Sequence, residues 1–213
     1  YLRGSVISGH AGHIRGLGAR LKKQGVSIFE NCAVTGFVQH GSNWRVNTKG
    51  GYIDTPRVIL TVNGHLESFG FERGRLMQLF LYAVMTPDLD QAALAKLGGK
   101  SRWGITPSDP MGTTMRRIDS GQGGNRIVTR TCATLRPNTV PTKKDLHRAA
   151  SVMQRKFDQR FPQLAGLKME YAWAGHLCFS LNGVAVMRQV ADGVFSGCVQ
   201  NGLGTTRGTL TGI

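Results

Sequence analysis

The sequence is poor in acidic residues. Its 213 residues include 12 Asp and Glu against 27 Lys and Arg, which gives a formal net charge of +15 at pH 7. A charge of this sign can attract nucleic acid or anionic lipid. The basic residues are spread along the chain, however, and aromatic side chains do not alternate with them as a base-stacking surface requires. We therefore predict no nucleic-acid partner.

Cysteine is scarce as well. Cys32, Cys132, Cys178 and Cys198 are the four cysteines, and no two of them are close in sequence. Their spacing therefore matches neither a metal-binding knuckle nor a Cys-x-x-Cys redox pair. We expect no bound metal and reduced thiols, which are typical of a cytoplasmic protein.

Long apolar runs are absent too. The most apolar stretch, residues 76–86 with the sequence LMQLFLYAVMT, is too short to cross a bilayer. Hydrophobic residues make up 40% of the chain, which is ordinary for a globular protein. A chain of this length can bury a full core, so we predict a folded protein without a membrane span.

The first third of the chain predicts a helix followed by strands. Ile14, Leu17 and Leu21 lie on one face of a helix over residues 12–24, and Gly25 is placed to end it. Short β-rich runs follow, separated by glycine-containing turns. The predicted strands are residues 26–29, 35–40, 43–48, 52–55 and 57–62.

The middle of the chain predicts an antiparallel region with one long helix. Residues 76–86 read as a strand, residues 88–97 as a short helix, and residues 113–119 and 126–131 as a hairpin. Thr142 followed by Asp145 is typical of a helix start, and Pro162 ends that helix.

The last forty residues carry the most informative pattern. Strands are predicted at residues 171–181, 184–187 and 194–199. Gln200-Asn201-Gly202-Leu203-Gly204 follows the last strand at once, and a helix begins near Thr205. A strand that runs through a glycine loop into a helix leaves backbone N–H groups unpaired, which favours binding of an anionic or electron-rich group. A plain strand-to-helix connection would show the same short pattern.

The order of these segments resembles a known family. Phe161-Pro162-Gln163-Leu164, then Tyr171-Ala172-Trp173-Ala174-Gly175, then Gly202-Leu203-Gly204 are similar to the end of the D-amino-acid-oxidase-like FAD-dependent oxidoreductases. The helix-glycine-strand unit over residues 16–37 is a second similarity. Within the family the chain resembles the γ-glutamylputrescine oxidase branch most, and the sarcosine and glycine oxidases less.

The resemblance implies an enzyme that oxidises the C–N bond of an amine or amino acid, with FAD as cofactor and dioxygen as acceptor. It places a set of residues against FAD, several of them through their backbone. They are Val34, Val62, Gly64, Gly175, Asn201, Gly202, Leu203, Gly204 and Thr205. It identifies neither the amine nor the catalytic residues, and the oligomeric state is left open.

The resemblance also suggests two substrate-binding candidates. In the family the predicted hairpin belongs to the sheet that covers the substrate pocket, so Arg117 or Arg130 could hold a substrate carboxylate. Both arginines could equally be solvated strand residues. Some relatives attach FAD through a cysteine near the 171–181 strand, but Leu177 and not Cys178 aligns with that position, and a buried structural cysteine is the better interpretation.

The implied fold is α/β (α+β), with part of a Rossmann-like FAD-binding lobe and an antiparallel-sheet substrate domain. We expect residues 1–70 and 173–213 in the FAD-binding lobe, and residues 71–172 in the substrate domain with a helix over 143–161. The Gly-x-Gly-x-x-Gly motif that opens such proteins is absent. We therefore expect the chain to be the later part of a longer oxidase. The alternative is a binding module without flavin, descended from an oxidase.

Overall fold

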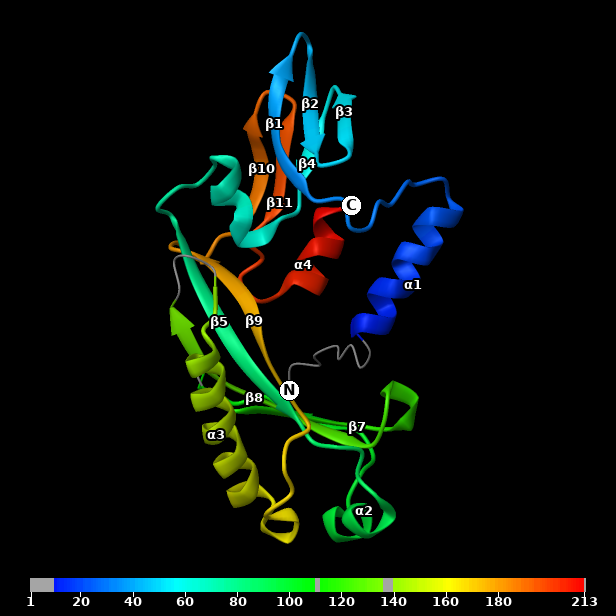
Figure 1. The fold of residues 1–213 in the computed structure, drawn as a ribbon, viewed down its shortest axis with the longest axis vertical. Coiled ribbons are helices and arrows are strands. Elements are labelled where there is room, and N and C mark those ends of the chain that lie inside the picture. The colour runs from blue at the N-terminus through cyan, green and yellow to red at the C-terminus, as the bar shows by residue number, and fades with distance from the viewer. Residues whose placement is uncertain (1–9, 110–111, 136–139, 213) are drawn as a thin grey trace. The chain divides into compact units, whose positions relative to one another are not determined.

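The computed structural model describes residues 10–109, 112–135 and 140–212, and side chains from Gly12 onward. The chain divides into two compact units. Unit 1 comprises the residues up to Arg73 and those from Val184 on, and unit 2 comprises Gly74–Gly183. The predicted mixed α/β fold is confirmed, with several sheets and flanking helices (Figure 1).

Unit 2 is built on one five-stranded antiparallel sheet. The strand order is β6-β7-β8-β5-β9. Its strands are β5 (Leu76–Met85), β6 (Trp103–Ile105), β7 (Thr114–Ile118), β8 (Arg126–Leu135) and β9 (Tyr171–Ser180). β5 and β9 pair from Leu76 opposite Ser180 to Met85 opposite Tyr171. The two long ribbons therefore run side by side over their whole length (Figure 1).

Helix α3 (Lys143–Arg160) covers one face of this sheet. The predicted start is confirmed, because Thr142 and Asp145 form a reciprocal capping box at its first turn. The apolar stripe of α3 packs on the alternating buried residues of β5. The residues that form this core are Phe80, Tyr82, Val84, Ala149 and Met153.

A second core lies toward the end of α3. It joins Phe157 of α3 to Met115 of β7 and Ile127 of β8. Two short 3-10 helices, η2 (Ser120–Gln122) and η3 (Pro162–Leu164), and helix α2 (Gln91–Leu97) complete the unit. The side chain of Asp90 caps α2 by accepting from the amide of Ala93 over 2.7 Å.

Unit 1 contains two small sheets. The first is an antiparallel meander of β1 (Val34–His40), β2 (Asn43–Thr48) and β3 (Gly51–Thr55). The second has the order β10-β11-β4, with β4 (Val58–Leu60), β10 (Val186–Ala191) and β11 (Val194–Cys198). Trp44 of β2 donates from Nε1 to the carbonyl oxygen of Asp192 over 3.0 Å, which ties the two sheets together.

Three helical segments complete unit 1. They are α1 (His10–Lys23), the 3-10 helix η1 (Asn63–Phe69) and α4 (Gly204–Thr211). The predicted strand over residues 26–29 was wrong, since this segment has no strand structure and Phe29 is 68% exposed. Within the described residues no strand pairs with it, so its apolar residues have no sheet to join.

Strand β9 belongs wholly to unit 2, whereas we expected most of it in the FAD-binding lobe. We expected the chain to return to the FAD-binding lobe at residue 173, whereas unit 2 continues to Gly183. The reason is that β9 pairs with β5 along all ten of its residues.

Among the described residues, no helix is both long and apolar enough to cross a membrane.

Candidate functional site

Two parallel strands of unit 1 end at the same edge of their sheet. β11 pairs with β4 in a parallel register that places Phe195 opposite Ile59 and Ser196 opposite Leu60. The chain leaves β4 toward Val62 and leaves β11 toward Gln200, so both connections start side by side. In open α/β sheets, ligands bind outside the carboxyl ends of such strands.

The connection after β11 has an unusual backbone. Val199, Asn201 and Gly202 have φ values of 56°, 52° and 82°. Glycine and asparagine adopt this left-handed region readily, but a β-branched residue does so only when its surroundings enforce it. Val199 is fully buried, and this burial holds the strained turn in place. Strain of this kind is concentrated at functional sites.

Helix α4 begins immediately after this turn with open N–H groups. Its N-cap is Leu203, whose side chain makes no capping hydrogen bond. The amides of Gly204, Thr205 and Thr206 lie in the first turn, where no helix carbonyl can accept from them. The helix also carries a partial positive charge at this end, so the site suits an anionic or electron-rich group.

Gln200 adds an unpaired acceptor beside these donors. Its amide nitrogen donates to the carbonyl oxygen of Gly197 over 3.1 Å. This bond fixes the orientation of the amide, and its buried Oε1 then has no partner among the described residues. A buried acceptor without a donor is costly, and a ligand group that donates to it would remove this cost. The sequence analysis missed Gln200, although it stands directly before the glycine loop.

The connection after β4 forms the other side of the candidate site. Asn63 has a φ of 50°, and Gly64 is buried in η1. Val62 is the N-cap of η1 and accepts from the amide of His65 over 3.1 Å. The structure therefore brings Val62 and Gly64 to the same edge as residues 201–205. His65 is exposed, so its side chain is not part of a buried site.

The other two predicted cofactor residues lie in different sheets. Val34 is the first residue of β1 in the meander, where it pairs with Thr48 and is 42% exposed. Gly175 is in β9 of unit 2, opposite Leu81 of β5. Neither belongs to the pair of connections at the β4 and β11 ends.

Among the described residues of unit 2, no helix packs on the sheet face opposite α3. Arg130 of β8, Ala83 of β5 and Trp173 of β9 are register neighbours, and directly paired residues share a face. Arg130 is half-buried and donates to Thr114 Oγ1 over 2.9 Å. Trp173 is 41% exposed. This face thus offers a cation, a hydroxyl and an aromatic surface to a ligand.

Arg117 lies on the other, helix-covered face. It is only 7% exposed, and its Nη1 donates to the carbonyl oxygens of Gly98 and Lys100 over 2.6 and 2.9 Å. These bonds fix the loop after α2. The placement argues against a role for Arg117 in binding substrate.

A charged cluster lies where β8 and β9 begin. Arg126 donates to Thr86 O over 2.9 Å and pairs with Glu170, and its guanidinium is 5.4 Å from the centre of the Tyr171 ring. The hydrogen bond from Arg126 lowers the pKa of the Glu170 carboxyl below its usual range, and a bond from Tyr171 adds to this. The carboxylate in turn raises the pKa of Tyr171 above its ordinary value. Tyr171 therefore stays protonated.

Cys178 is fully buried in β9 opposite Gln78. Gln78 is itself buried, so both lie on the face that α3 covers. Leu177, the neighbouring residue, pairs with Leu79 on the opposite face. The buried position fits the structural role predicted for this cysteine.

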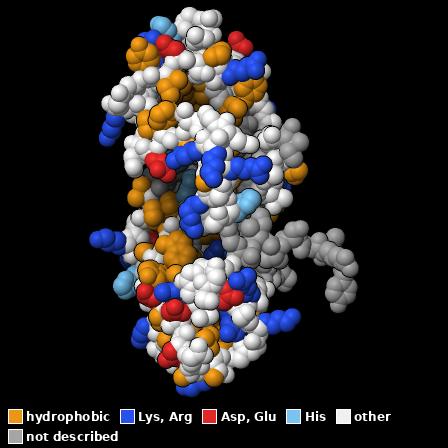
Figure 2. All heavy atoms as spheres, turned by 90° about the vertical axis from the view of Figure 1, so that its right-hand side faces the viewer, with side chains coloured by type: hydrophobic (Ala, Val, Ile, Leu, Met, Phe, Trp, Pro, Cys, Tyr) orange, Lys and Arg blue, Asp and Glu red, His pale blue; other side chains and the backbone are white. Residues whose placement is uncertain are grey.

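Basic side chains are distributed over the surface. Lys and Arg occur along the whole visible face, with fewer Asp and Glu between them (Figure 2). Several of the acids are engaged by arginines: Asp54 by Arg45, Asp119 by Arg102 and Glu72 by Arg188. With 12 Asp and Glu against 27 Lys and Arg, the chain has too few carboxylates to pair every basic side chain.

The paired strand ends, the strained turn and the open helix N-terminus are typical of α/β proteins that bind an anionic or electron-rich group at the carboxyl ends of their strands. The donors of α4 and the buried acceptor of Gln200 fit a cofactor that carries both acceptor and donor groups. A family model described as "DAO: FAD dependent oxidoreductase" matches residues 2–213. The chain belongs to this family, and FAD is the family's cofactor. The predicted family is therefore confirmed.

Solved structures show the same fold. The chain is similar to glycine oxidase from Geobacillus kaustophilus, with a TM-score of 0.71 and 14% identity over 93% of this chain and 50% of that one. It is similar to L-amino acid deaminase from Proteus vulgaris, with a TM-score of 0.65 and 14% identity over 92% and 55%. It is also similar to iminodiacetate oxidase from Chelativorans sp. BNC1, with a TM-score of 0.62 and 15% identity over 93% of this chain and 52% of that one. No curated protein sequence matches the chain.

The coverage of these structures is itself informative. The chain spans about half the length of each protein that it resembles. At such low identity the similarity establishes the fold and not the substrate.

Proposed function

We propose that the protein oxidises the C–N bond of an amine or amino acid with FAD as cofactor and dioxygen as acceptor. The observation that carries the proposal is the open N-terminus of α4 beside the β4 end, in a chain whose family uses FAD. The residues proposed to contact FAD are Val34, Val62, Gly64, Gly175, Asn201, Gly202, Leu203, Gly204 and Thr205. To these we add Gln200, through its buried Oε1.

FAD, when bound, supplies the two-electron oxidation, and the protein supplies binding, orientation and electrostatics. The amides of Gly204, Thr205 and Thr206 would stabilise negative charge at the cofactor, in the manner of an oxyanion hole. The positive end of α4 acts in the same direction. Gln200 would accept a hydrogen bond from a donor group and so select one orientation of the cofactor.

The substrate is proposed to lie against the sheet face of unit 2 opposite α3. Arg130 is the better of the two arginine candidates, because it is on this face while Arg117 is buried on the other. Its guanidinium could bind a substrate carboxylate in a bidentate manner. Trp173 would pack against the apolar part of the substrate.

Two finer proposals concern branch and location. The Tyr171–Gly175 strand and the Phe161–Leu164 turn support assignment to the γ-glutamylputrescine oxidase branch. The four cysteines are free thiols, two of them buried, and this supports a reducing, cytoplasmic setting.

The proposal is tested by flavin binding and then by reaction with amines. The protein as it is encoded is mixed with FAD and desalted, and the visible spectrum is recorded. Retained flavin bands that bleach under nitrogen with one amine of a panel, and return with air and release of peroxide, are the expected result. A protein that retains flavin but reacts with no amine refutes the substrate class. One that never retains flavin refutes the enzyme and favours a flavin-free module.

A further inference from the structure

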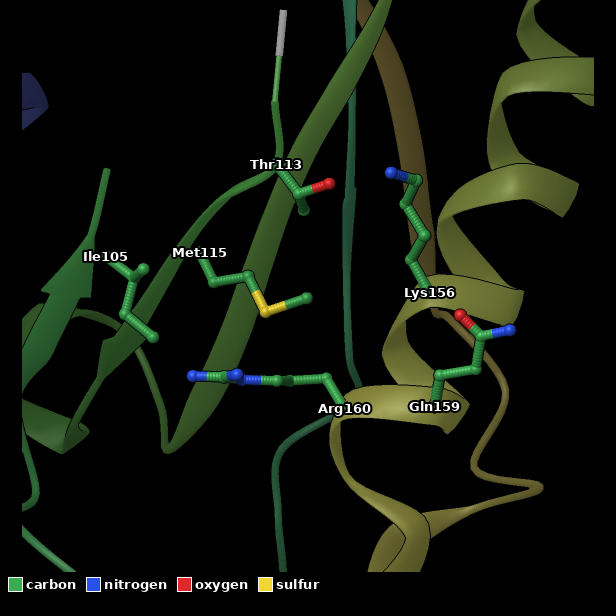
Figure 3. Close-up of a pocket in the computed structure, with 6 residues that line it drawn as sticks. All are labelled: Ile105, Thr113, Met115, Lys156, Gln159 and Arg160. Carbon is green, nitrogen blue, oxygen red and sulfur yellow. The ribbon is translucent and has the colours of Figure 1, made fainter. Parts of the chain in front are cut away.

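A separate pocket lies on the helix-covered side of unit 2. It has a volume of about 350 Å³ and is lined by Ile105, Thr113, Met115, Lys156, Gln159 and Arg160. These residues come from β6, from β7 and the residue directly before it, and from the last two turns of α3. Figure 3 shows Arg160 reaching from α3 below Met115 toward Ile105, while the Thr113 hydroxyl is directed toward the side of Lys156.

The pocket concentrates positive charge. Lys156 and Arg160 are four residues apart on α3, so their side chains leave the same face of the helix. Neither has an acidic partner among the described residues, and no Asp or Glu stands three or four positions from either along α3. Like charges at this spacing repel each other and weaken a helix. An anion between the two side chains would remove this repulsion.

The remaining lining residues divide into polar and apolar groups. Thr113 and Gln159 offer a hydroxyl and an amide. Ile105 and the buried Met115 form an apolar wall. The lining therefore suits an anion that carries a short apolar chain rather than a bare inorganic ion.

This pocket is distinct from the proposed substrate face. Met115 packs in the core with Phe157 of α3, which places it on the covered face of the sheet. Arg130 and Trp173 lie on the opposite face. A ligand in this pocket would therefore not touch the face that we assign to the substrate.

The helix dipole explains only one of the two cations. Arg160 is in the last turn of α3, where a positive charge interacts favourably with the helix C-terminus. Lys156 lies one turn earlier, where this effect has fallen off. The helix dipole therefore stabilises the charge of Arg160 and not that of Lys156.

We propose that this pocket binds a small organic anion, with its carboxylate or phosphate held by Lys156, Arg160 and Thr113 and its apolar part against Ile105 and Met115. The proposal is independent of flavin. It predicts saturable binding that weakens as salt rises, because salt screens the partly exposed charges.

The test is calorimetric titration of the protein with hexanoate, hexyl phosphate, inorganic phosphate and hexanol. Saturable binding of hexanoate or of hexyl phosphate is the expected result. Comparison of these two affinities shows whether the pocket prefers a carboxylate or a phosphate. We expect Lys156→Gln and Arg160→Gln each to weaken it by about tenfold, the typical loss of one charge-assisted hydrogen bond. Arg155→Gln is the matched control, because it removes a neighbouring exposed charge of α3 that does not line the pocket.

Other results overturn the proposal. Equal affinity for hexanol would show that charge is not recognised, and equal weakening by Arg155→Gln would show attraction by net charge alone. If Arg160→Gln lost anion binding and Lys156→Gln kept it, the anion would be bound by the C-terminal end of α3 alone and not by the pair of cations. The substituted side chains are all exposed on α3, so we expect thermal melting followed by circular dichroism to show that every variant is folded. Lys156→Met serves as a second variant.

Discussion

The thiol of Cys198, at the end of β11, donates to the carbonyl oxygen of Leu60, at the end of β4, over 3.1 Å. Both residues are buried. The contact holds together two strand ends that lie 138 residues apart in sequence. The connections that start there are consequently fixed relative to each other, as a preorganised cofactor site requires.

The N-terminus of α4 can be tested with a matched pair of glycines. A Cβ added at Gly204 or at Gly208 would meet nothing within 4 Å, so both positions have open space for the first side-chain atom. Gly204 lies in the first turn of α4, and Gly208 lies one turn later. We expect Gly204→Val to weaken FAD binding by at least about tenfold, because the new side chain covers the amides.

The control for this prediction is Gly208→Val, which adds the same side chain to the same helix. Flavin fluorescence quenching gives the dissociation constant of each variant, and circular dichroism checks the helix. Equal FAD affinities of Gly204→Val and Gly208→Val would show that the N-terminus of α4 does not contact the flavin.

The two strand arginines should separate binding from stability. Arg130→Met removes a cation from the sheet face opposite α3, and we expect kcat/KM to fall by about ten- to a hundredfold with a carboxylate-bearing substrate. Arg117→Met leaves the carbonyls of Gly98 and Lys100 without their donor, and we expect unfolding to become easier by about 1–3 kcal/mol.

Urea unfolding and steady-state kinetics on both variants check this contrast. The expected pattern is a stable but weakly active Arg130 variant and a destabilised Arg117 variant with unchanged kinetics at low temperature. The reverse pattern would place the substrate on the helix-covered face.

Local signals predicted much of this fold. The capping box at Thr142 and the alternating meander depend on residues close in sequence, and both formed as expected. The segment 26–29 has the composition of a strand, but a strand also needs a partner, which a local pattern does not supply. The backbone of Val199 was not predictable, because its φ of 56° is imposed by tertiary burial.

The faces of Arg117 and Arg130 also needed non-local information. Arg117 pairs with Ile127, so residues 127 and 129 point to the covered face and Arg130 to the other. The sequence predicts the hairpin but not its register, because seven residues separate the two strands. A bulge at Cys132, where φ is 66°, shifts the alternation further along β8.

The ion pair of Arg126 and Glu170 should appear in the pH dependence of stability. Arg126 lowers the pKa of Glu170 in the folded protein. Its contribution is therefore complete above the ordinary carboxyl pKa of about 4.3 and is lost as pH falls through the lower folded value. We expect Glu170→Gln to be less stable than the natural protein at neutral pH and to differ little from it in strong acid.

Thermal unfolding of both proteins across the acid range measures this convergence. Glu30→Gln is the control, since Glu30 is exposed and has no ion pair among the described residues. A gap between Glu170→Gln and the natural protein that stays constant with pH would mean that charge is not its cause.

The turn between β10 and β11 should be the most sensitive glycine position of unit 1. Gly193 has a φ of 67°, and a Cβ there would lie 2.9 Å from the carbonyl oxygen of Pro56 and 3.2 Å from Trp44 Nε1. Gly41 in the β1–β2 turn has a similar φ of 62° but open space around it. We expect Gly41→Ala to cost about 1 kcal/mol for the left-handed backbone alone.

Gly193→Ala should cost more than about 2 kcal/mol, because relief of the clash separates the β10–β11 turn from Pro56 and Trp44. The 3.0 Å bond from Trp44 to Asp192 would be disturbed at the same time. Urea unfolding followed by tryptophan fluorescence compares the two variants directly. Equal costs at both positions would show that only the backbone conformation matters, and that the two sheets of unit 1 are not held together at this turn.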